Sequence, residues 1–264
     1  MYTIVRAKGD AGKAGEPLPT LFKTLAENTV HFRRGQFTLI AAAPGVGKSA
    51  FSLCLSLHAG VPAFYFSADT DPQTMFVRSA ANVSGWSTRD IENALEKGNT
   101  ATVEAQLNGL DHLRWDFQAS LTIDDLEAEL KAFAVTYGAW PELIIVDNLS
   151  NVVPDAEGDS NSYVALEKVC EYLHALARET GACVLALHHV KGDSNDGDKP
   201  VPLSQIKGQI GRVPEMILTL HRVGEDSDRR MGVSVVKNRT GRADASGAMT
   251  LYLEADMERM RLTG

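Results

Sequence analysis

The chain has 264 residues, of which 44% are hydrophobic, and it carries a formal charge of −8 at pH 7. This length and composition suffice for one large α/β core. No apolar stretch is long enough to span a membrane and the first residues lack the apolar segment of a signal peptide, so we expect a cytoplasmic protein without membrane contact. The acidic balance excludes a surface that is basic throughout, although a local positive channel for nucleic acid is compatible with it.

Short apolar runs alternate with helical patterns from Leu21 onward, whereas residues 1–20 have no hydrophobic periodicity. We expect an N-terminal arm over 1–20, either disordered or lying on a neighbouring subunit, and one domain over 21–264. The predicted strands are Phe37–Ala41, Ala63–Ser67, Leu113–Phe117, Leu143–Val146, Cys183–Leu187, Met216–His221, Gly232–Lys237 and Met249–Leu253. The predicted helices are Ser49–His58, Pro72–Val83, Thr88–Lys97, Ile123–Tyr137 and Tyr163–Thr180.

This alternation favours an α/β fold with a mostly parallel central sheet flanked by helices and with antiparallel strands at the C-terminal end. Thr122 and Asp125 have the spacing of a capping box that opens the fourth predicted helix. Two acidic loops rich in Gly, Ser and Asn, Pro154–Ser162 and Gly192–Pro200, follow strand ends on the side where open α/β sheets bind ligands.

The segment that starts at Ala42 reads Ala-Ala-Pro-Gly-Val-Gly-Lys-Ser and lies between a predicted strand and a predicted helix. In this context the backbone N–H groups and the helix dipole bind phosphates, the lysine reaches the β- and γ-phosphates, and the serine ligands Mg²⁺. The usual first glycine is replaced by Ala42, which requires a negative φ there. The predicted nucleoside-triphosphate loop comprises Ala43, Pro44, Gly45, Val46, Gly47, Lys48 and Ser49.

Two further predicted strands end in a carboxylate. The run Leu143–Val146 ends at Asp147, and a buried strand that brings an Asp beside a phosphate loop is suited to holding the water shell of Mg²⁺. The run Ala63–Ser67 is followed by Asp69, which we expect to polarise the attacking water; the alternative is that it caps the next helix, a task for which Asp71 is better placed.

Polar residues also follow two later strands. His189, the second of a histidine pair, is expected to sense the γ-phosphate, because no third residue with zinc-ligand spacing is evident. Lys237 and Arg239 lie at a hairpin tip that cannot readily reach its own phosphate loop across the sheet. They form either arginine fingers that act on a neighbouring copy or a solvated basic turn.

The order of these motifs resembles the RecA-like ATPase domain of DnaB-type hexameric replicative helicases, in a phage- or plasmid-like version without the N-terminal domain. The resemblance runs from about Leu18 to Leu253 and is carried by Pro17–Thr20, by Arg34–Ala42 leading into the loop, by Phe66–Thr70, and by Arg78. It implies a P-loop NTPase fold with ATP and Mg²⁺ as cofactors.

By this resemblance, Asp69 stands where the family has a catalytic glutamate, and its side chain is one methylene shorter. Asp147 matches the metal-binding strand end, and His189 stands where the family has a sensor glutamine. Lys237 and Arg239 match a Lys-x-Arg hairpin that acts on the neighbouring subunit's ATP, which favours the finger interpretation.

The resemblance also implies partners: a homo-oligomer, in the form of a hexameric ring, around single-stranded DNA. The channel loops correspond to Asn151–Ser162 and Lys191–Arg212, although their sequences match poorly. The candidate contacts to DNA phosphates are Lys191, Lys199, Lys207 and Arg212, and nearby acidic residues oppose them. About twenty residues precede the match, so no primase or loader partner is assigned.

We therefore expect a ring-forming ATP hydrolase of the DNA helicase type that translocates on single-stranded DNA. Two alternatives remain open at this point. One is a recombination or repair ATPase acting on branched DNA, for which no nuclease carboxylate cluster is evident. The other is a nucleotide-gated ring that organises partners without translocation.

Overall fold

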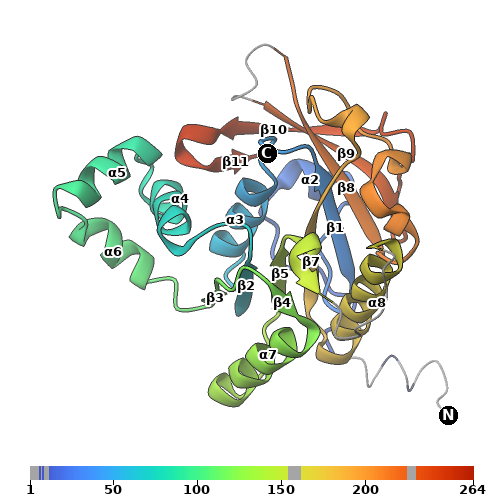
Figure 1. Ribbon diagram of the computed structural model, residues 1–264, viewed down its shortest axis with the longest axis horizontal. Helices are drawn as coiled ribbons and strands as arrows, with labels where there is room; N and C mark the ends of the chain where they lie inside the picture. Colours follow the sequence, from blue (N-terminus) through green and yellow to red (C-terminus); the bar gives the residue numbers. More distant parts are fainter. Residues whose placement is uncertain (1–5, 7, 9–11, 154–161, 225–229) are drawn as a thin grey trace.

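The computed structural model describes Arg6, Lys8 and residues 12–153, 162–224 and 230–264 (Figure 1). Nine strands of these residues form one sheet in the order β11-β10-β9-β8-β1-β7-β5-β2-β3. The pairs from β8 to β3 are parallel, and the pairs from β8 to β11 are antiparallel. The strands are β1 (Phe37–Ala42), β2 (Ala63–Ser67), β3 (Leu113–Asp116), β5 (Leu143–Asp147), β7 (Cys183–His189), β8 (Met216–Arg222), β9 (Arg230–Asn238), β10 (Thr250–Asp256) and β11 (Arg261–Thr263).

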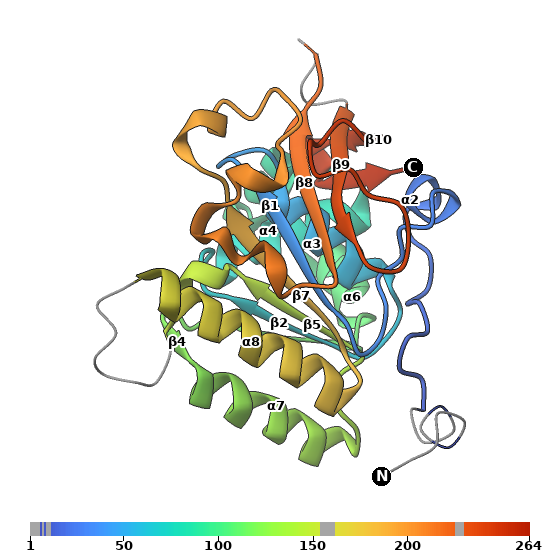
Figure 2. The ribbon, with the colours of Figure 1, turned by 90° about the vertical axis from the view of Figure 1, so that its right-hand side faces the viewer.

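Helices cover both faces of this sheet. On β2, Phe64 packs against Phe133 of α7, whereas the next residue, Tyr65, faces α3, so these two helices lie on opposite faces. Figure 2 shows α8 beside α7 on the same side of the sheet. The helices are α2 (Lys23–Glu27), α3 (Lys48–His58), α4 (Pro72–Ser84), α5 (Thr88–Glu96), α6 (Ala101–Asn108), α7 (Ile123–Tyr137) and α8 (Ser162–Thr180).

The central strands are buried on both faces. Every residue of β1 and β5 is buried, and in β7 the last residue alone, His189, is partly exposed. A continuous apolar run is what a parallel strand between two helical layers requires. The predicted fold class, a mostly parallel sheet with antiparallel strands at the C-terminal end, is therefore confirmed.

Several elements were not predicted from the sequence. The helices α2, with 5 residues, and α6, with 8, are too short for their hydrophobic residues to show a clear helical period. Leu121–Thr122 (β4) and Val152–Val153 (β6) form a separate pair of two-residue strands, and β11 follows Met260, whose φ is positive. Strand β7 runs two residues beyond its predicted end, so both histidines belong to the strand.

The described part of the predicted arm lies against its own domain. The Gly15 N–H donates to the Arg34 carbonyl at 2.8 Å, and the Leu18 N–H donates to the Phe32 carbonyl at 2.7 Å. Leu18 is buried in the main core, and the Arg34 guanidinium forms an ion pair with Glu142. Contact of the arm with a neighbouring subunit stays a prediction, and residues 1–5, 7 and 9–11 lie outside the described residues.

The capping box predicted for α7 is present. Thr122 Oγ1 accepts from the Asp125 N–H at 3.1 Å, and Asp125 Oδ2 accepts from the Thr122 N–H at 2.8 Å. These two bonds satisfy N–H groups that have no partner inside the helix.

We expect Thr122→Ala to lower the free energy of unfolding by about 1 kcal/mol, because it removes the acceptor at the helix N-terminus. Urea denaturation of both proteins measures this difference. Thr136→Ala, in the same helix, is the matched control: Thr136 Oγ1 donates to the Ala132 carbonyl inside the helix, and its loss is expected to change stability by less than about 0.5 kcal/mol. Equal losses in the two variants would contradict the capping role.

Candidate active site

Four parallel strands end at one edge of the sheet. Ala42 of β1 is in register with His189 of β7, and Ser67 of β2 is in register with Asp147 of β5. The predicted phosphate loop, both predicted carboxylates and the predicted sensor therefore share the carboxyl edge, where open α/β sheets bind ligands.

The loop between β1 and α3 has the backbone that phosphate binding needs. Gly45 and Gly47 have φ of 75° and 113°, whereas Ala42 ends β1 without a positive φ, as the prediction required. The φ of Gly47 favours glycine, whereas the atoms nearest to a Cβ there, Met231 Cε at 2.8 Å and Met257 Cε at 3.0 Å, are ends of flexible side chains that can move aside.

Lys48 bends back over the loop. Its Nζ donates to the carbonyls of Ala42 at 3.0 Å and Ala43 at 3.1 Å. Burial lowers the pKa of Lys48, and the nearby carboxylates of Asp147 and Asp69 act in the opposite direction. An ammonium group held this way is poised to exchange carbonyl oxygens for phosphate oxygens.

Asp147 is buried and hydrogen-bonded. Its Oδ2 accepts from the Tyr65 hydroxyl at 2.9 Å, and its main-chain carbonyl accepts from the N–H groups of Ala68 at 2.8 Å and Asp69 at 3.2 Å. Burial raises the pKa of the Asp147 carboxyl, hydrogen bonds from Ser49 and Tyr65 lower it, and Asp69 raises it. The carbonyl of Asp147 thus fixes the start of the segment that carries Asp69.

Asp69 is exposed at the edge of the site. The alternative role weighed for it, the cap of α4, belongs to Asp71, whose side chain accepts from the Thr74 N–H at 3.0 Å. The carboxylate of Asp69 therefore has no task in the helix cap and faces solvent beside Lys48.

The two histidines at the end of β7 have different surroundings. Asn148 Oδ1 accepts from the Ser150 N–H, so its Nδ2 donates to His189 Nε2 at 3.1 Å, and His189 carries its proton on Nδ1. Burial and Lys48 lower the pKa of His189. His188 is fully buried and its Nε2 donates to the Lys207 carbonyl at 3.0 Å; burial lowers the pKa of His188 to about 4.

Lys237 and Arg239 lie at the opposite edge of the sheet. Lys237 of β9 is in register with Ile217 of β8. The Arg239 N–H donates to the Glu215 carbonyl, and the Glu215 carboxylate accepts from the N–H of Phe37 at the start of β1. The six residues of β1 separate this edge from the phosphate loop, which corresponds to about 20 Å. These cations cannot reach the loop of their own chain.

The two side chains bind the 3₁₀ turn η4 (Lys207–Arg212). Lys237 Nζ donates to the carbonyls of Gly211 and Arg212, both at 2.7 Å. Arg239 Nη2 donates to the Arg212 carbonyl at 3.0 Å, and its Nη1 lies 3.6 Å from Glu215 Oε1.

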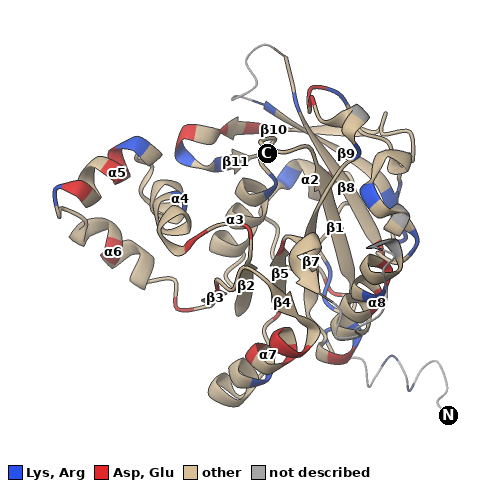
Figure 3. Ribbon diagram, in the orientation of Figure 1, with Lys and Arg blue, Asp and Glu red and all other residues tan. Residues whose placement is uncertain are grey.

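The predicted DNA contacts differ in availability. Lys199 and Lys207 are exposed, Lys191 Nζ donates to the Ser204 carbonyl at 2.6 Å, and the Arg212 guanidinium forms an ion pair with Glu167 of α8. Figure 3 shows the central strands largely without charged positions, and Lys or Arg positions close to Asp or Glu positions on α5 and α8. Residues 154–161, within the other predicted channel loop, lie outside the described residues.

The acidic loop after β7 contacts the phosphate loop. A Cβ at Gly197, whose φ is 68°, would lie 2.5 Å from Val46 Cγ2 and 3.3 Å from Ala43 Cβ. Arg222 at the end of β8 fixes the loop, because its N–H donates to the Gly197 carbonyl and its Nη2 donates to the Asp196 carbonyl, both at 2.7 Å.

Several residues of the site were missed from the sequence. Tyr65 and Asn148 bond the predicted functional residues Asp147 and His189, and Gly197 with Arg222 holds the acidic loop to the phosphate loop. Each contact joins segments far apart in the chain, and no local motif marks it.

The donor set fits a magnesium nucleotide. The Ser49 hydroxyl and the Asp147 carboxylate lie together beside Lys48 and the phosphate loop. Hydroxyl and carboxylate oxygens are ligands that Mg²⁺ prefers. Among the residues that the structure describes, no three His, Cys, Asp or Glu side chains gather as another metal site.

In the same described part of the chain, no helix is long and apolar enough to cross a membrane.

We expect Gly197→Ala to raise the dissociation constant for ATP several-fold, because the new Cβ would lie 2.5 Å from Val46 Cγ2 at a positive φ and would force the acidic loop and the phosphate loop apart. Calorimetric titration measures the constant. Gly192→Ala in the same loop is the control, since the nearest atom to its Cβ is Asn195 Nδ2 at 4.0 Å and its φ is not positive. Unchanged affinity in Gly197→Ala would mean that the contact has no part in nucleotide binding.

Comparison with known proteins identifies relatives of this chain. It is 46% identical over 257 residues to "Gene 65 protein" of Mycobacterium phage L5, covering 96% of this chain and 95% of that protein. It is 25% identical over 244 residues to the "Probable plasmid replicative DNA helicase" of Chlamydia psittaci, covering 85% of this chain and 51% of that protein, so it spans about half of the helicase.

The fold has a counterpart among solved structures. The structure of an isolated ATPase domain superposes with a TM-score of 0.83 at 18% identity, covering 99% of this chain and 95% of the other, which confirms the RecA-like architecture. A family model described as the DnaB-like helicase C terminal domain matches residues 17–261. Because this match spans nearly the whole chain, the protein belongs to the family of DnaB-like helicase C-terminal domains.

Proposed function

We propose that this protein is the ATPase subunit of a ring-shaped DNA motor, which hydrolyses ATP between adjacent copies and moves along single-stranded DNA. The observation that carries this proposal is the separation of Lys237 and Arg239 from the phosphate loop by the length of β1. Each copy then offers its phosphate loop at one edge of the sheet and its cations at the other. A head-to-tail contact between copies joins the two, and such contacts form a ring when the rotation from copy to copy closes.

Within one copy, each residue has a distinct task. Lys48 holds the β- and γ-phosphates, and the N–H groups of the loop bind the remaining phosphate oxygens. Ser49 and Asp147 would hold Mg²⁺, which when bound neutralises charge on the phosphates. Asp69 orients and polarises the attacking water from its exposed position.

The proton positions support a sensor role for His189. Its Nε2 accepts from Asn148, so its free ring donor is Nδ1. The neutral His189 ring can donate from Nδ1 to a γ-phosphate oxygen when that phosphate is present. Because the ring is neutral, it adds no second positive charge beside Lys48.

In the neighbouring copy, Lys237 and Arg239 supply positive charge to the phosphoryl group as the bond to the leaving phosphate breaks. Both side chains also bind η4, the end of the segment proposed to contact DNA. The exposed ammonium groups of Lys199 and Lys207 supply phosphate contacts on that segment.

We expect Lys48→Ala to lose both ATP binding and turnover, and Arg239→Ala to lose turnover while it still binds ATP. Mixing the two inactive variants tests the shared site. In randomly mixed rings about one interface in four pairs an intact loop with an intact finger, so turnover is expected to return to about a quarter of the wild-type rate.

Arg242→Ala is the matched control, because it removes an exposed cation from the same turn. This variant is expected to turn over ATP at the wild-type rate. Full activity of Arg239→Ala alone, or no recovery on mixing when native mass spectrometry shows mixed rings, would contradict the shared site.

We expect the double variant Lys199→Ala/Lys207→Ala to bind oligo-dT more weakly, because the two exposed ammonium groups release counterions from the strand. The slope of log affinity against log salt concentration is expected to fall by about 0.7 per lost contact, or about 1.4 in total. Fluorescence anisotropy at several salt concentrations measures it. Lys97→Ala, an exposed cation on the turn after α5, is the control for the loss of charge itself.

The acidic loop and the engaged Arg212 favour a second candidate, a nucleotide-gated ring that does not move on DNA. Stimulation of ATP turnover by oligo-dT separates the two. A motor couples the two events, whereas a gated ring without translocation hydrolyses ATP at the same rate with and without the strand.

A further inference from the structure

A tyrosine that no motif marks lies directly behind the proposed magnesium site. Tyr65 is completely buried in the middle of β2, and its hydroxyl lies 2.9 Å from Asp147 Oδ2 and 2.8 Å from Ser52 Oγ. Ser52 comes from the first turns of α3, the helix that the phosphate loop opens. The tyrosine hydroxyl therefore joins the phosphate-loop helix to the carboxylate of β5.

The direction of these hydrogen bonds follows from the groups involved. An ionised carboxylate only accepts, so the single proton of the Tyr65 hydroxyl goes to Asp147. The proton between Tyr65 and Ser52 can then come from Ser52 alone, whose single proton has two acceptors, the Tyr65 hydroxyl oxygen at 2.8 Å and the Ser49 carbonyl at 3.1 Å. When Ser52 donates to Tyr65, the chain of donation runs from Ser52 through Tyr65 to Asp147.

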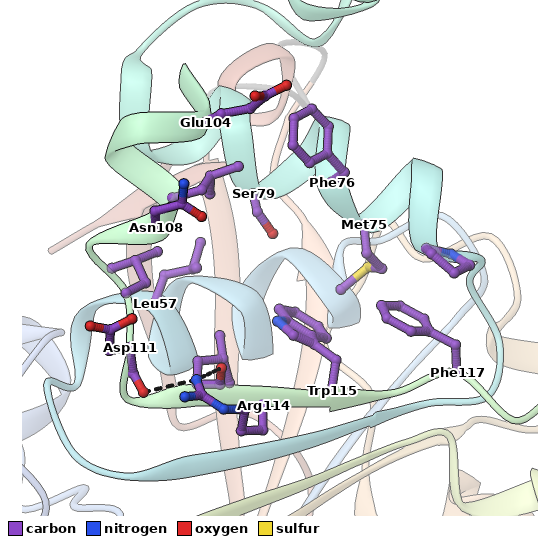
Figure 4. Close-up of a pocket in the computed structure, with 14 residues that line it drawn as sticks. Leu57, Met75, Phe76, Ser79, Glu104, Asn108, Asp111, Arg114, Trp115 and Phe117 are labelled. Atoms are coloured by element: carbon purple, nitrogen blue, oxygen red, sulfur yellow. Dashed lines mark hydrogen bonds between the residues drawn. The ribbon is translucent and has the colours of Figure 1, made fainter. Parts of the chain in front are cut away.

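The ring of Tyr65 is fixed by a stack of aromatic side chains. Its centroid lies 4.6 Å from that of Trp115, and Trp115 lies 5.8 Å from Phe117 with nearly parallel rings. Figure 4 shows Trp115, Phe117 and Met75 lining a pocket of about 380 Å³ between α4, α6 and β3. The stack thus runs from this pocket inward to the hydroxyl on Asp147.

A hydroxyl is not needed to fill this space. The ring of Tyr65 stacks on Trp115, and a phenylalanine at this position would keep that stacking. What the hydroxyl adds is one directed hydrogen bond to one oxygen of Asp147, while Lys48, Ser49 and Asp69 surround the same carboxylate. Groups that orient a ligating carboxylate from behind commonly control how well the metal binds.

We infer that Tyr65 is a positioning residue that orients the Asp147 carboxylate for Mg²⁺, held in place by Ser52 and by the Trp115–Phe117 stack. This inference rests on the proposed ATPase function and adds residues to its metal site. Tyr65 itself does not touch the nucleotide, since the hydroxyl is turned toward Asp147 and Ser52.

The test is Tyr65→Phe, which removes the hydroxyl and keeps the ring. We expect its affinity for ATP in EDTA to match the wild-type value, because the phosphate loop is intact. The Mg²⁺ concentration that gives half of the tightening of ATP binding is expected to rise about tenfold or more. Turnover is expected to fall at low Mg²⁺ and to recover at saturating Mg²⁺.

A second measurement does not depend on turnover. In a Trp86→Phe/Trp140→Phe background, Trp115 is the remaining tryptophan of the chain. Its emission, recorded while Mg²⁺ is titrated into the ATP complex, is expected to report the same shifted midpoint when Tyr65→Phe is added. Ser52→Ala, which removes the donor to Tyr65, is expected to shift the midpoint in the same direction by a smaller factor.

Tyr137→Phe is the matched control, because the Tyr137 hydroxyl accepts from Arg114 Nε on the surface of α7 and does not contact the site. A wild-type Mg²⁺ midpoint in both Tyr65→Phe and Ser52→Ala would overturn the inference and leave Tyr65 as a core residue. Absence of any Mg²⁺ effect on ATP binding in the unmodified protein would instead refute the proposed function, so the two failures are distinguishable.

Discussion

The parallel register between β1, β7, β5 and β2 is the constraint on which the site depends. These strands are apolar on both faces, so hydrophobic alternation alone does not fix their pairing, and a slip of one residue turns every side chain to the other face. Polar contacts at the carboxyl edge add to the backbone pairing in the observed register. The carbonyl of Asp147 accepts from two N–H groups of the β2 extension, and Asn148 bonds His189 of β7. The side-chain bond between Asn148 and His189 is thus specific to this register of β5 and β7.

Charge inside this site is arranged so that few groups are both buried and unpaired. Lys48 and Asp147 are buried, and each stabilises the charged form of the other against the cost of burial. Asp69 is exposed, where water supports its charge, and His189 has a lowered pKa and stays neutral near Lys48. Introducing phosphates adds negative charge next to a lysine that burial has made easier to deprotonate. A bound nucleotide would thereby stabilise the ammonium form, which two carbonyls already support.

Local patterns were sufficient for the phosphate loop, the capping box and the five predicted helices, because each depends on residues within a few positions of one another. They also located Asp147 and Asp69 at strand ends. Contacts across the sheet were beyond reach of such patterns: Tyr65 and Asp147 are 82 positions apart, and nothing between them marks the bond. The pair His188 and His189 was evident as a motif. Successive side chains of a strand point to opposite faces of the sheet, so the pairing of β7 with its neighbours decides which ring is buried and which lies at the site.

The turn η4 connects the two edges of the molecule. At its start, the Lys207 carbonyl accepts from His188, whose neighbour in β7 is the proposed sensor His189. At its end, the carbonyls of Gly211 and Arg212 accept from Lys237 and Arg239. If those two cations turn toward a neighbour's phosphates, they give up the hydrogen bonds that hold the end of η4. One short segment is therefore hydrogen-bonded both to the strand that carries His189 and to Lys237 and Arg239, and Lys207, an exposed cation, lies on that segment. Under the proposed function, this bonding is a route by which hydrolysis in a site shared between copies would be coupled to movement on a charged strand.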